Sequence, residues 1–480
     1  MVKQMIEEVV AEVKANPGKW EEMVQEIGYG VAQRIGVMLL ERLDEQLMEG
    51  RGEGLRVVGC RGRWVATLFG DIWVRRRVYR ERGGQYRCLL DEAIGLRKRC
   101  QSSPRLEALA TYLCTHLPFG KSEEVLKALV PGGISHTTIH RLVGRVVDGY
   151  MEEEAGEVAE VFEEGVVPES EGRVVSPLLV EGDGVNISLQ REEERRGEIK
   201  VAVAYEGWEP VGKDRYRLKE KTSHVGMMSG RELWESFSVL LAKRYDLGRI
   251  DQIVVGGDGS EWVKEGAEML GGIYQLDRFH LLRALRRGLR DDQVGPVYEA
   301  CVVGDVARAD ELLRQAQTAV KGEAAKRISE LRGYILNNAD GLRDYRLEVG
   351  YREGLRGLGT IESNVDKLVA SRMKKRGMSW TKRGGDRMAR LINLRERGEL
   401  HLWVNGLHQS DGHKRTVPRF KLRPESDKPT ENKYRVWLEA GLPALYGPHH
   451  NHPCVQTLAA IAHETKSVTR LLSGIAPTKS

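Results

Sequence analysis

Three carboxylates stand where a metal ion could be held: Asp183, Asp258 and Glu362. Asp183 follows the apolar run of LLVEGDG, and Asp258 follows the apolar run of IVVGGDG. Glu362 lies at the start of GTIESNVDKLVASRMKKRGMSW, a segment that is otherwise basic. Converging carboxylates form a hard oxygen site that suits Mg²⁺ or Mn²⁺. Two such ions, about 3.5–4 Å apart, stabilise the attacking and leaving oxygens of a phosphodiester that is being cleaved.

The basic run that follows Glu362 suggests a polyanion as the substrate. Residues 367–397 contain eleven Lys and Arg against two acids, whereas the whole chain has a net charge of only +5. Such a local block favours contact with phosphates. Simpler interpretations stay open, because each Asp-Gly pair is typical of a turn and a surface acid beside a basic helix is common.

A sheet has to bring the two aspartates together. Residues 173–290 contain three successive strand candidates and then alternate between strand and helix, which is the element order of the RNase H fold. In that order the first strand lies beside the fourth, so Asp183 and Asp258 meet. A helix with a stripe of apolar residues at helical spacing would place Glu362 against the strand ends; the stripe consists of Ile361, Val365, Leu368, Val369 and Met373.

The segment before this sheet predicts a DNA-reading element. Residues 1–103 are predicted to form helices and then a small antiparallel sheet, and 104–150 to form a helix-turn-helix. Ser135 is placed to cap the second helix. The exposed face of that helix would offer His136, Thr137, His140 and Arg141. Two packed helices joined by an ordinary glycine turn are the alternative.

The fold class is therefore predicted as mixed α/β, with an RNase H-like catalytic domain interrupted by a helical insertion. Residues 151–172 carry nine acids and no base, which predicts an acidic linker. The remaining predicted segments are a first catalytic part at 173–290, the insertion at 291–355, a second catalytic part carrying Glu362 at 356–400, and a C-terminal tail at 401–480.

Composition narrows the class of protein. The six cysteines include no CxxC pair, which argues against zinc fingers and disulfide frameworks and fits reduced thiols in the cytoplasm. No apolar run is long enough to span a membrane, and no GxxxxGK[ST] phosphate loop occurs. Near the C-terminus, four residues of metal-ligand type lie close together: His449, His450, His452 and Cys454. No second pair of ligands occurs at zinc-finger spacing, so we expect a polar loop there.

Several motifs together resemble those of bacterial insertion-sequence transposases of the Lre type, in the DDE class near the Mutator-like group. They are EGDGVNISLQ with KVAVAYEGW, GGDGSEW, LDRFH and GTIESNVDKLVASRMKKRGMSW, and the resemblance runs from about residue 1 to 397. It implies Asp183, Asp258 and Glu362 as the metal-binding catalytic triad. It also implies that Asp277 and His280 in LDRFH organise the site or contact DNA rather than hold the metal.

The resemblance extends the predicted DNA contacts. It implies that the helix-turn-helix recognises terminal inverted repeats, and that Trp380 stacks on an unpaired base, with core packing as the alternative for this tryptophan. Further phosphate contacts are predicted at Arg75, Arg76, Arg77, Arg372, Lys374, Lys375 and Arg376.

The resulting hypothesis is a transposase that nicks transposon ends with Mg²⁺ or Mn²⁺ and joins the released 3′-hydroxyl to target DNA. Its partners would be double-stranded DNA and a second copy of the chain, because two ends must be brought together. The alternatives are a nuclease of the same fold that cuts without joining, and a non-catalytic DNA-binding regulator derived from a transposase.

Overall fold

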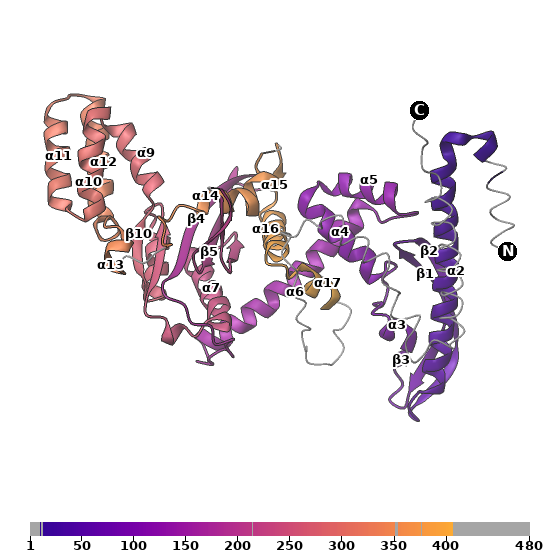
Figure 1. Cartoon of the computed structure of the whole chain (residues 1–480). Coiled ribbons are helices and arrows are strands. Elements are labelled where there is room, and N and C mark those ends of the chain that lie inside the picture. Colours follow the sequence, from indigo (N-terminus) through magenta and orange to yellow (C-terminus); the bar gives the residue numbers. More distant parts are fainter. Residues whose placement is uncertain (1–9, 11–12, 214, 351–353, 376, 407–480) are drawn as a thin grey trace, which may run out of the picture. The chain divides into compact units, whose positions relative to one another are not determined.

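The computed structural model describes residues 10, 13–213, 215–350, 354–375 and 377–406, and the elements named below belong to these residues (Figure 1). Helices and strands are both prominent, which confirms the mixed α/β class. None of the helices in the described part of the chain has the length and apolarity needed to cross a membrane.

The N-terminal region is a long helix on a small antiparallel sheet, as predicted. Val37, Leu40 and Leu43 of the helix pack on Val65 and Ile72 of the sheet. The strands pair in the order β1-β2-β3. The elements are η1 (Pro17–Lys19), α2 (Trp20–Glu49), β1 (Leu55–Thr67), β2 (Gly70–Glu81), β3 (Tyr86–Arg87) and α3 (Leu89–Ala93).

Three helices follow: α4 (Pro104–His116), α5 (Phe119–Leu129) and α6 (His136–Phe162). The hydroxyl of Ser135 accepts a hydrogen bond from the backbone N–H of Thr138, which confirms the predicted helix cap. The acidic linker predicted at 151–172 is corrected, because α6 continues through its first half. Glu and Ala favour helix, and Glu154 forms an ion pair with Arg390 at 2.5 Å, so this acidic stretch packs instead of linking.

The central sheet has the strand order β10-β9-β4-β5-β8. Its strands are β4 (Leu178–Leu189), β5 (Arg196–Tyr205), β8 (Thr222–Gly226), β9 (Ile253–Gly257) and β10 (Ile273–Leu276), and the short β11 (Ser379–Trp380) also pairs with β4. The pairs β4–β5 and β5–β8 are antiparallel, whereas β4–β9 and β9–β10 are parallel. The predicted adjacency of the first strand and the strand before Asp258 is thus confirmed.

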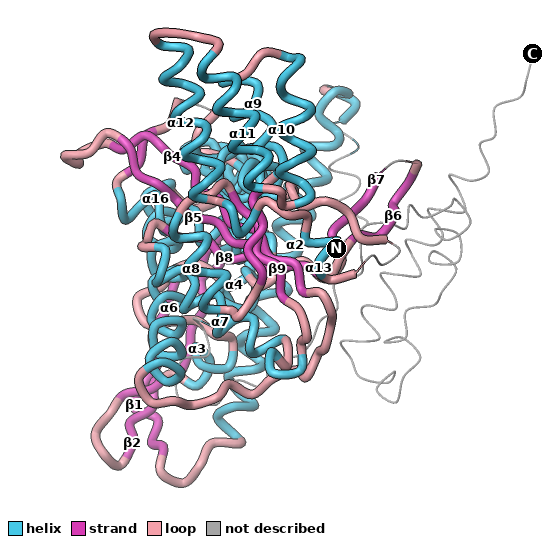
Figure 2. The backbone as a smooth tube through the Cα atoms, turned by 90° about the vertical axis from the view of Figure 1, so that its left-hand side faces the viewer, coloured by secondary structure: helices cyan, strands magenta, loops and turns pink. Residues whose placement is uncertain are grey.

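The third strand candidate of this sheet, at residues 214–226, divides in two. Residues 208–218 form a separate hairpin of β6 (Trp208–Gly212) and β7 (Arg215–Leu218), and β8 alone is the third strand of the central sheet. Figure 2 shows this hairpin away from the central strands. The sequence suggested one continuous strand because both pieces are short and rich in residues that favour strands.

Helices cover both faces of the central sheet. On one face, Val180 and Ala202 belong to the same core as Trp234 and Phe237 of α7 (Gly230–Arg244). On the other face, Val201 and the other alternate residues share a core with α6 and with α16 (Lys382–Glu396). The remaining elements here are η2 (Leu247–Arg249), α8 (Glu261–Met269) and α17 (Leu400–Gly406), the last of which crosses the predicted domain boundary at 401.

The predicted insertion at 291–355 is helical in its described residues. Its helices share a core of Leu313, Ile328 and Leu331 with Leu281 and Leu285 of the preceding helix. The elements are α9 (Arg278–Gly288), α10 (Asp291–Val303), α11 (Val306–Thr318), α12 (Glu323–Asn337), η3 (Ala339–Gly341) and α13 (Tyr345–Glu348).

The segment that carries Glu362 is a helix with an inserted π turn. It consists of α14 (Ile361–Val365), the π-helical η4 (Asp366–Ala370) and α15 (Ser371–Met373). All members of its predicted apolar stripe are buried, which confirms that stripe; they are Ile361, Val365, Leu368, Val369 and Met373. The buried stripe fixes the face on which Glu362 stands.

Candidate metal centre

The parallel pairing of β4 and β9 brings the first two aspartates to the same level of the sheet. Gly182 of β4 is paired with Gly257 of β9, and Asp183 and Asp258 directly follow these two residues. Close packing requires glycine at 257 and leaves little room for a side chain at 182. A Cβ on Gly257 would lie 2.9 Å from the carbonyl oxygen of Gly182, and one on Gly182 would lie 3.1 Å from the ring of Trp262.

The turn interpretation of the two Asp-Gly pairs holds for one of them only. Asp183 lies inside β4, which continues to Leu189, so it is not at a strand end as the sequence suggested. The reason is that β5 pairs with β4 beyond the point where β9 ends. Asp258 does lie in a bend after β9, and its Oδ1 accepts the backbone N–H of Ser260 at 3.0 Å.

Asp277 and His280 come from the junction of β10 and α9. Asp277 caps the helix, since its Oδ1 accepts the N–H of Phe279 at 3.2 Å. Its Oδ2 lies 2.8 Å from Nδ1 of His280, one helical turn further on. Asp277 is buried, and its own N–H donates to the carbonyl of Gly257 at 2.7 Å. The pair is therefore anchored to the strand that precedes Asp258.

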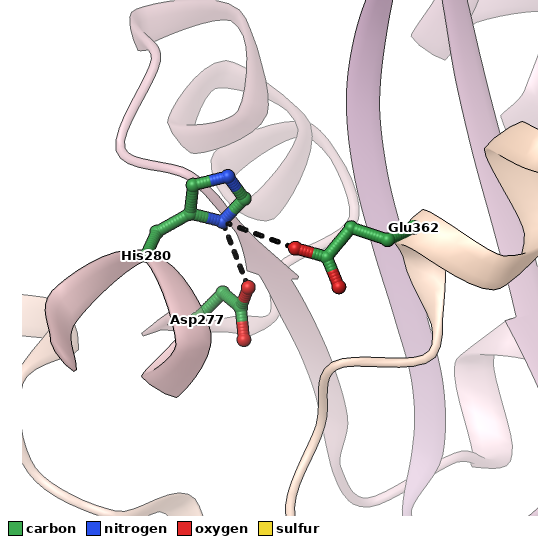
Figure 3. Close-up of side chains that lie close together, drawn as sticks. All are labelled: Asp277, His280 and Glu362. Carbon is green, nitrogen blue, oxygen red and sulfur yellow. Dashed lines mark hydrogen bonds and ion pairs between the residues drawn. The ribbon is translucent and has the colours of Figure 1, made fainter. Parts of the chain in front are cut away.

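Glu362 approaches this pair from a segment far along the chain. Its Oε1 lies 3.9 Å from Nδ1 of His280 (Figure 3). One ligand atom each from Asp277, His280 and Glu362 falls within 4.8 Å of the others. Oε1 of Glu362 is buried and has no hydrogen-bond partner. A buried carboxylate oxygen without a donor is costly unless something positive completes it.

The electrostatics of the site reflect an excess of negative charge. Burial, and after it the nearby charge of Asp258, raises the pKa of Asp183 to about 6. Burial and the charge of Asp277 raise the pKa of Glu362. The pKa of His280 is also raised, chiefly by its hydrogen bond to Asp277. Among the described residues, no Lys or Arg forms an ion pair with any of these carboxylates.

These residues fit a divalent cation. Carboxylate oxygens suit Mg²⁺ and Mn²⁺, an imidazole nitrogen favours transition metals, and the unpartnered oxygen of Glu362 lacks a positive neighbour within bonding distance. Of the predicted triad, the tight cluster contains Glu362 but neither Asp183 nor Asp258. It contains Asp277 and His280, which were predicted to organise the site, and Asp183 is linked to it through its electrostatic coupling to both.

Two contacts around the site were not predicted from the sequence. Glu181, two residues before Asp183, is buried and accepts hydrogen bonds from the loop before Glu362. Tyr334 of the helical insertion donates its hydroxyl to the carbonyl of Asp258 at 2.9 Å. The one signal for Glu181 was a charged residue inside an apolar run; Tyr334 had none.

Several predicted DNA contacts are available at the surface. Four predicted contacts are exposed on the N-terminal turns of the second helix, α6: His136, Thr137, His140 and Arg141. Arg75 and Lys374 are exposed as well. His136 also contacts an acid, since its Nδ1 lies 2.6 Å from Glu123 of α5.

Other predicted contacts are corrected because their side chains are used inside the protein. Arg372 is buried and donates to the carbonyls of Cys114 and Leu117. Trp380 is buried and donates its indole N–H to the carbonyl of Met373 at 3.1 Å, so the core alternative is confirmed.

Three further cations are paired with acids. Arg76 lies 2.9 Å from Asp91, and Arg77 lies 2.6 Å from Asp44, so both tie the N-terminal sheet to neighbouring helices. Lys375 is exposed but pairs with Asp366. Some predictions lie outside the described residues: Arg376, His449, His450, His452 and Cys454.

Comparison with known proteins identifies relatives along most of the chain. A family described as an uncharacterised protein family, UPF0236, matches residues 15–406. A protein of Streptococcus gallolyticus, named UPF0236 protein in vanSb 3'region, is 26% identical over 375 residues, which is 76% of this chain and 79% of that protein. A UPF0236 protein of Caldanaerobacter subterraneus subsp. tengcongensis is 24% identical over 401 residues, or 80% of this chain and 77% of the relative.

Proposed function

The chain belongs to the uncharacterised protein family UPF0236, and from that premise we propose that it is a DNA transposase of the DDE class, of the Lre type. Metal-dependent cleavage at transposon ends and strand transfer into target DNA would be its two reactions. Both are phosphoryl transfers, so one site can serve them.

The strand order supports an RNase H-like assignment of the catalytic domain. Three antiparallel neighbours, β8, β5 and β4, are followed by two parallel strands, β9 and β10. The chain then leaves the sheet for the helical insertion and returns with Glu362. This path is the one expected for a catalytic domain whose last carboxylate follows an insertion.

The observation that carries the proposal is the set of carboxylates without a Lys or Arg partner beside the ends of β9 and β10. Asp183, Asp258, Asp277 and Glu362 come from four separate elements, and none is paired with a Lys or Arg within the described residues. If these four residues only stabilised the fold, apolar side chains or pairs of opposite charge would serve equally well. Their excess charge favours a cation as the missing partner.

Asp183, Asp258 and Glu362 would hold the ions, of which two are expected. When bound, a divalent cation supplies positive charge beside the scissile phosphate and lowers the pKa of a water ligand. The hydrogen bond from His280 to Asp277 fixes the orientation of the imidazole and makes Nδ1 the protonated nitrogen. Nδ1 lies 3.9 Å from Oε1 of Glu362, so the imidazole contributes charge near Glu362 without a hydrogen bond to it.

DNA is the substrate that several exposed residues elsewhere on the chain favour. The N-terminal turns of α6 expose His136, Thr137, His140 and Arg141, as expected of a recognition helix in a helix-turn-helix. Exposed Arg75 and Lys374 add positive charge for phosphate contacts. A homodimer would bring two ends together, and a bacterial cytoplasmic location would fit contact with the chromosome.

The family also offers a circumstantial argument. The name of one Caldanaerobacter relative joins eleven designations, which we interpret as several copies of one gene in a genome. Repeated copies are what a mobile element produces, and they are harder to explain for a nuclease of DNA repair.

The test is cleavage of a supercoiled plasmid that carries the DNA flanking this gene, with Mg²⁺ or Mn²⁺. We expect nicks at defined boundaries with the wild-type chain. Glu362→Gln, Asp183→Asn and Asp258→Asn should each lose roughly 10³-fold or more in rate while keeping DNA binding. Glu330→Gln, which changes an exposed carboxylate of α12, is the matched control and should cleave normally.

The same assay separates the alternatives. Joining of pre-cleaved ends to a target plasmid distinguishes a transposase from a nuclease of the same fold. Specific binding without any metal-dependent nick would contradict the enzyme and favour a regulator.

A further inference from the structure

We propose that Glu181 is a positioning residue that sets the place of Glu362 by holding the start of its helix. This inference rests on the proposed function, because it assigns Glu181 to the same metal centre. Glu181 is not a member of the cluster of Asp277, His280 and Glu362; it acts on the backbone that carries Glu362.

The contacts of Glu181 are unusually complete for one side chain. Its Oε2 accepts the backbone N–H groups of Gly359 at 3.0 Å, Thr360 at 2.8 Å and Ile361 at 3.0 Å. Its Oε1 accepts the hydroxyls of Thr360 at 2.7 Å and Tyr205 at 2.5 Å. The carboxylate is 1% exposed, so water does not share these bonds.

One of the three backbone donors, the N–H of Ile361, is the first of the helix, and those of Gly359 and Thr360 lie directly before it. The first N–H groups of a helix have no partner inside it, and a side chain just before the helix usually accepts from them. Thr360 stands at that position but its side chain accepts no such bond, and its hydroxyl donates to Glu181. The cap of α14 is therefore supplied by β4, a strand about 180 residues earlier.

This cap couples the two halves of the metal centre. Glu181 lies two residues before Asp183 on β4, and its Oε2 bonds the residue directly before Glu362. The loop has little freedom to adjust. Gly359 has φ +128°, which disfavours other residues, and a Cβ there would lie 3.3 Å from Oδ1 of Asp277. Movement of the loop would thus displace Glu362 from both Asp183 and His280.

A purely structural role is the competing explanation, since a buried carboxylate with five donors also stabilises the fold. The two roles differ in what they predict for the metal. A positioning role requires that metal affinity and turnover change more than stability does. A purely structural role changes stability alone, as would any equally buried acid elsewhere.

The chain provides a matched control in Glu107 of α4. It is also 1% exposed and accepts bonds from Arg97 and Ser102, yet it lies outside the site. We compare Glu181→Gln with Glu107→Gln in the full chain. Three quantities are measured: Mn²⁺ affinity from the electron paramagnetic resonance signal of free Mn²⁺, hydrogen exchange at residues 359–361, and plasmid cleavage.

For Glu181→Gln we expect Mn²⁺ affinity to fall by roughly 10–100-fold, the usual effect of losing a residue that orients metal ligands. Cleavage should lose kcat with little change in KM for DNA, and exchange at residues 359–361 should accelerate. Glu181→Asp should restore part of the affinity. Glu107→Gln should leave Mn²⁺ affinity and exchange at residues 359–361 unchanged, whatever it does to thermal stability.

Tyr205→Phe keeps the proposal testable if Glu181→Gln does not fold. It removes one hydroxyl donor to Oε1 and leaves the backbone bonds, so we expect a smaller loss of Mn²⁺ affinity in the same direction. Unchanged Mn²⁺ affinity and kcat in a folded Glu181→Gln or Tyr205→Phe protein would overturn the positioning role.

The failure of the proposed function has a different signature. If Glu362→Gln itself leaves Mn²⁺ binding and cleavage intact, the metal centre is misassigned, and faster exchange at 359–361 in Glu181→Gln then reports only a lost helix cap. If Glu362→Gln abolishes both but Glu181→Gln changes neither, the centre stands and only the positioning role fails.

Discussion

Two groups of partly buried acids in this protein differ in whether a cation neutralises them. Glu154 of α6 is met by Arg390 of α16 at 2.5 Å, and Arg390 also contacts Asp386 of its own helix. Asp183 and Glu362, at the edge of the central sheet, are met by no Lys or Arg of the described residues. We refer to the first group as the paired acids and to the second as the open acids.

The pKa directions express this difference. Burial favours the neutral form of Glu154, but the positive side chains beside it, Arg390 among them, outweigh burial, so its pKa lies below the ordinary value. For Asp183 burial is reinforced by Asp258, and the pKa rises to about 6. The comparison teaches that burial alone does not mark a functional acid; burial without a countercharge does.

The largest effect on stability should come from breaking the paired acids. Arg390→Gln leaves Glu154 and Asp386 buried beside each other without their cation, and removal of one partner of a buried pair costs about 3–5 kcal/mol. The thermal unfolding transition should shift down accordingly, while Mn²⁺ affinity stays at the wild-type value.

A control follows from the pair itself. The double variant Glu154→Gln with Arg390→Gln should recover part of the loss, because the uncompensated charge has gone. If the Arg390→Gln protein were as stable as wild type, the paired acids would not be structural. They would then not differ from the open acids in this respect.

The open acids should behave in the reverse way. Asp183→Asn removes a charge that the folded protein disfavours, so in EDTA at pH 8 it should stabilise by up to about 3 kcal/mol, the equivalent of a shift of roughly two pKa units. The raised pKa means that the folded state binds more protons between pH 4 and 6. Stability of the wild type therefore falls as pH rises through this window, and the benefit of the variant should vanish near pH 4.

Thermal unfolding at several pH values measures this effect. Asp251→Asn, which changes an exposed aspartate, is the control and should shift the transition little at any pH. Mn²⁺ should stabilise the wild type and not Asp183→Asn, because a ligand stabilises only the state that binds it. Destabilisation by Asp183→Asn at pH 8 would place this aspartate with the structural acids.

Local sequence patterns predicted the positions of the open acids well. Apolar runs before Asp183 and Asp258 identify two strands that pair side by side up to these residues, and the apolar stripe from Ile361 to Met373 orients the helix of Glu362. These features depend on periodicity over a few residues, which one sequence contains.

Contacts between distant segments could not be predicted in the same way. The sequence shows that Arg372 is basic. It does not show that Arg372 donates hydrogen bonds to the carbonyls of Cys114 and Leu117, more than 250 residues away. The basic run at 367–397 was predicted to grip phosphates. Several of its cations instead meet acids of α6, as Arg387 does with Asp148.

The smallest predicted effect concerns the cations that remain at the surface. Lys374 is exposed, and if it contacts a phosphate, Lys374→Gln should lower the slope of log affinity against log salt by about one and weaken DNA binding equally for all sequences. Lys321→Gln, an exposed cation of the helical insertion, should leave the slope unchanged. Binding to flanking and unrelated DNA across salt concentrations measures both. Equal slopes for the two variants would mean that DNA does not pass over the end of the Glu362 helix. The basic residues beside the open acids would then have to bind another polyanion.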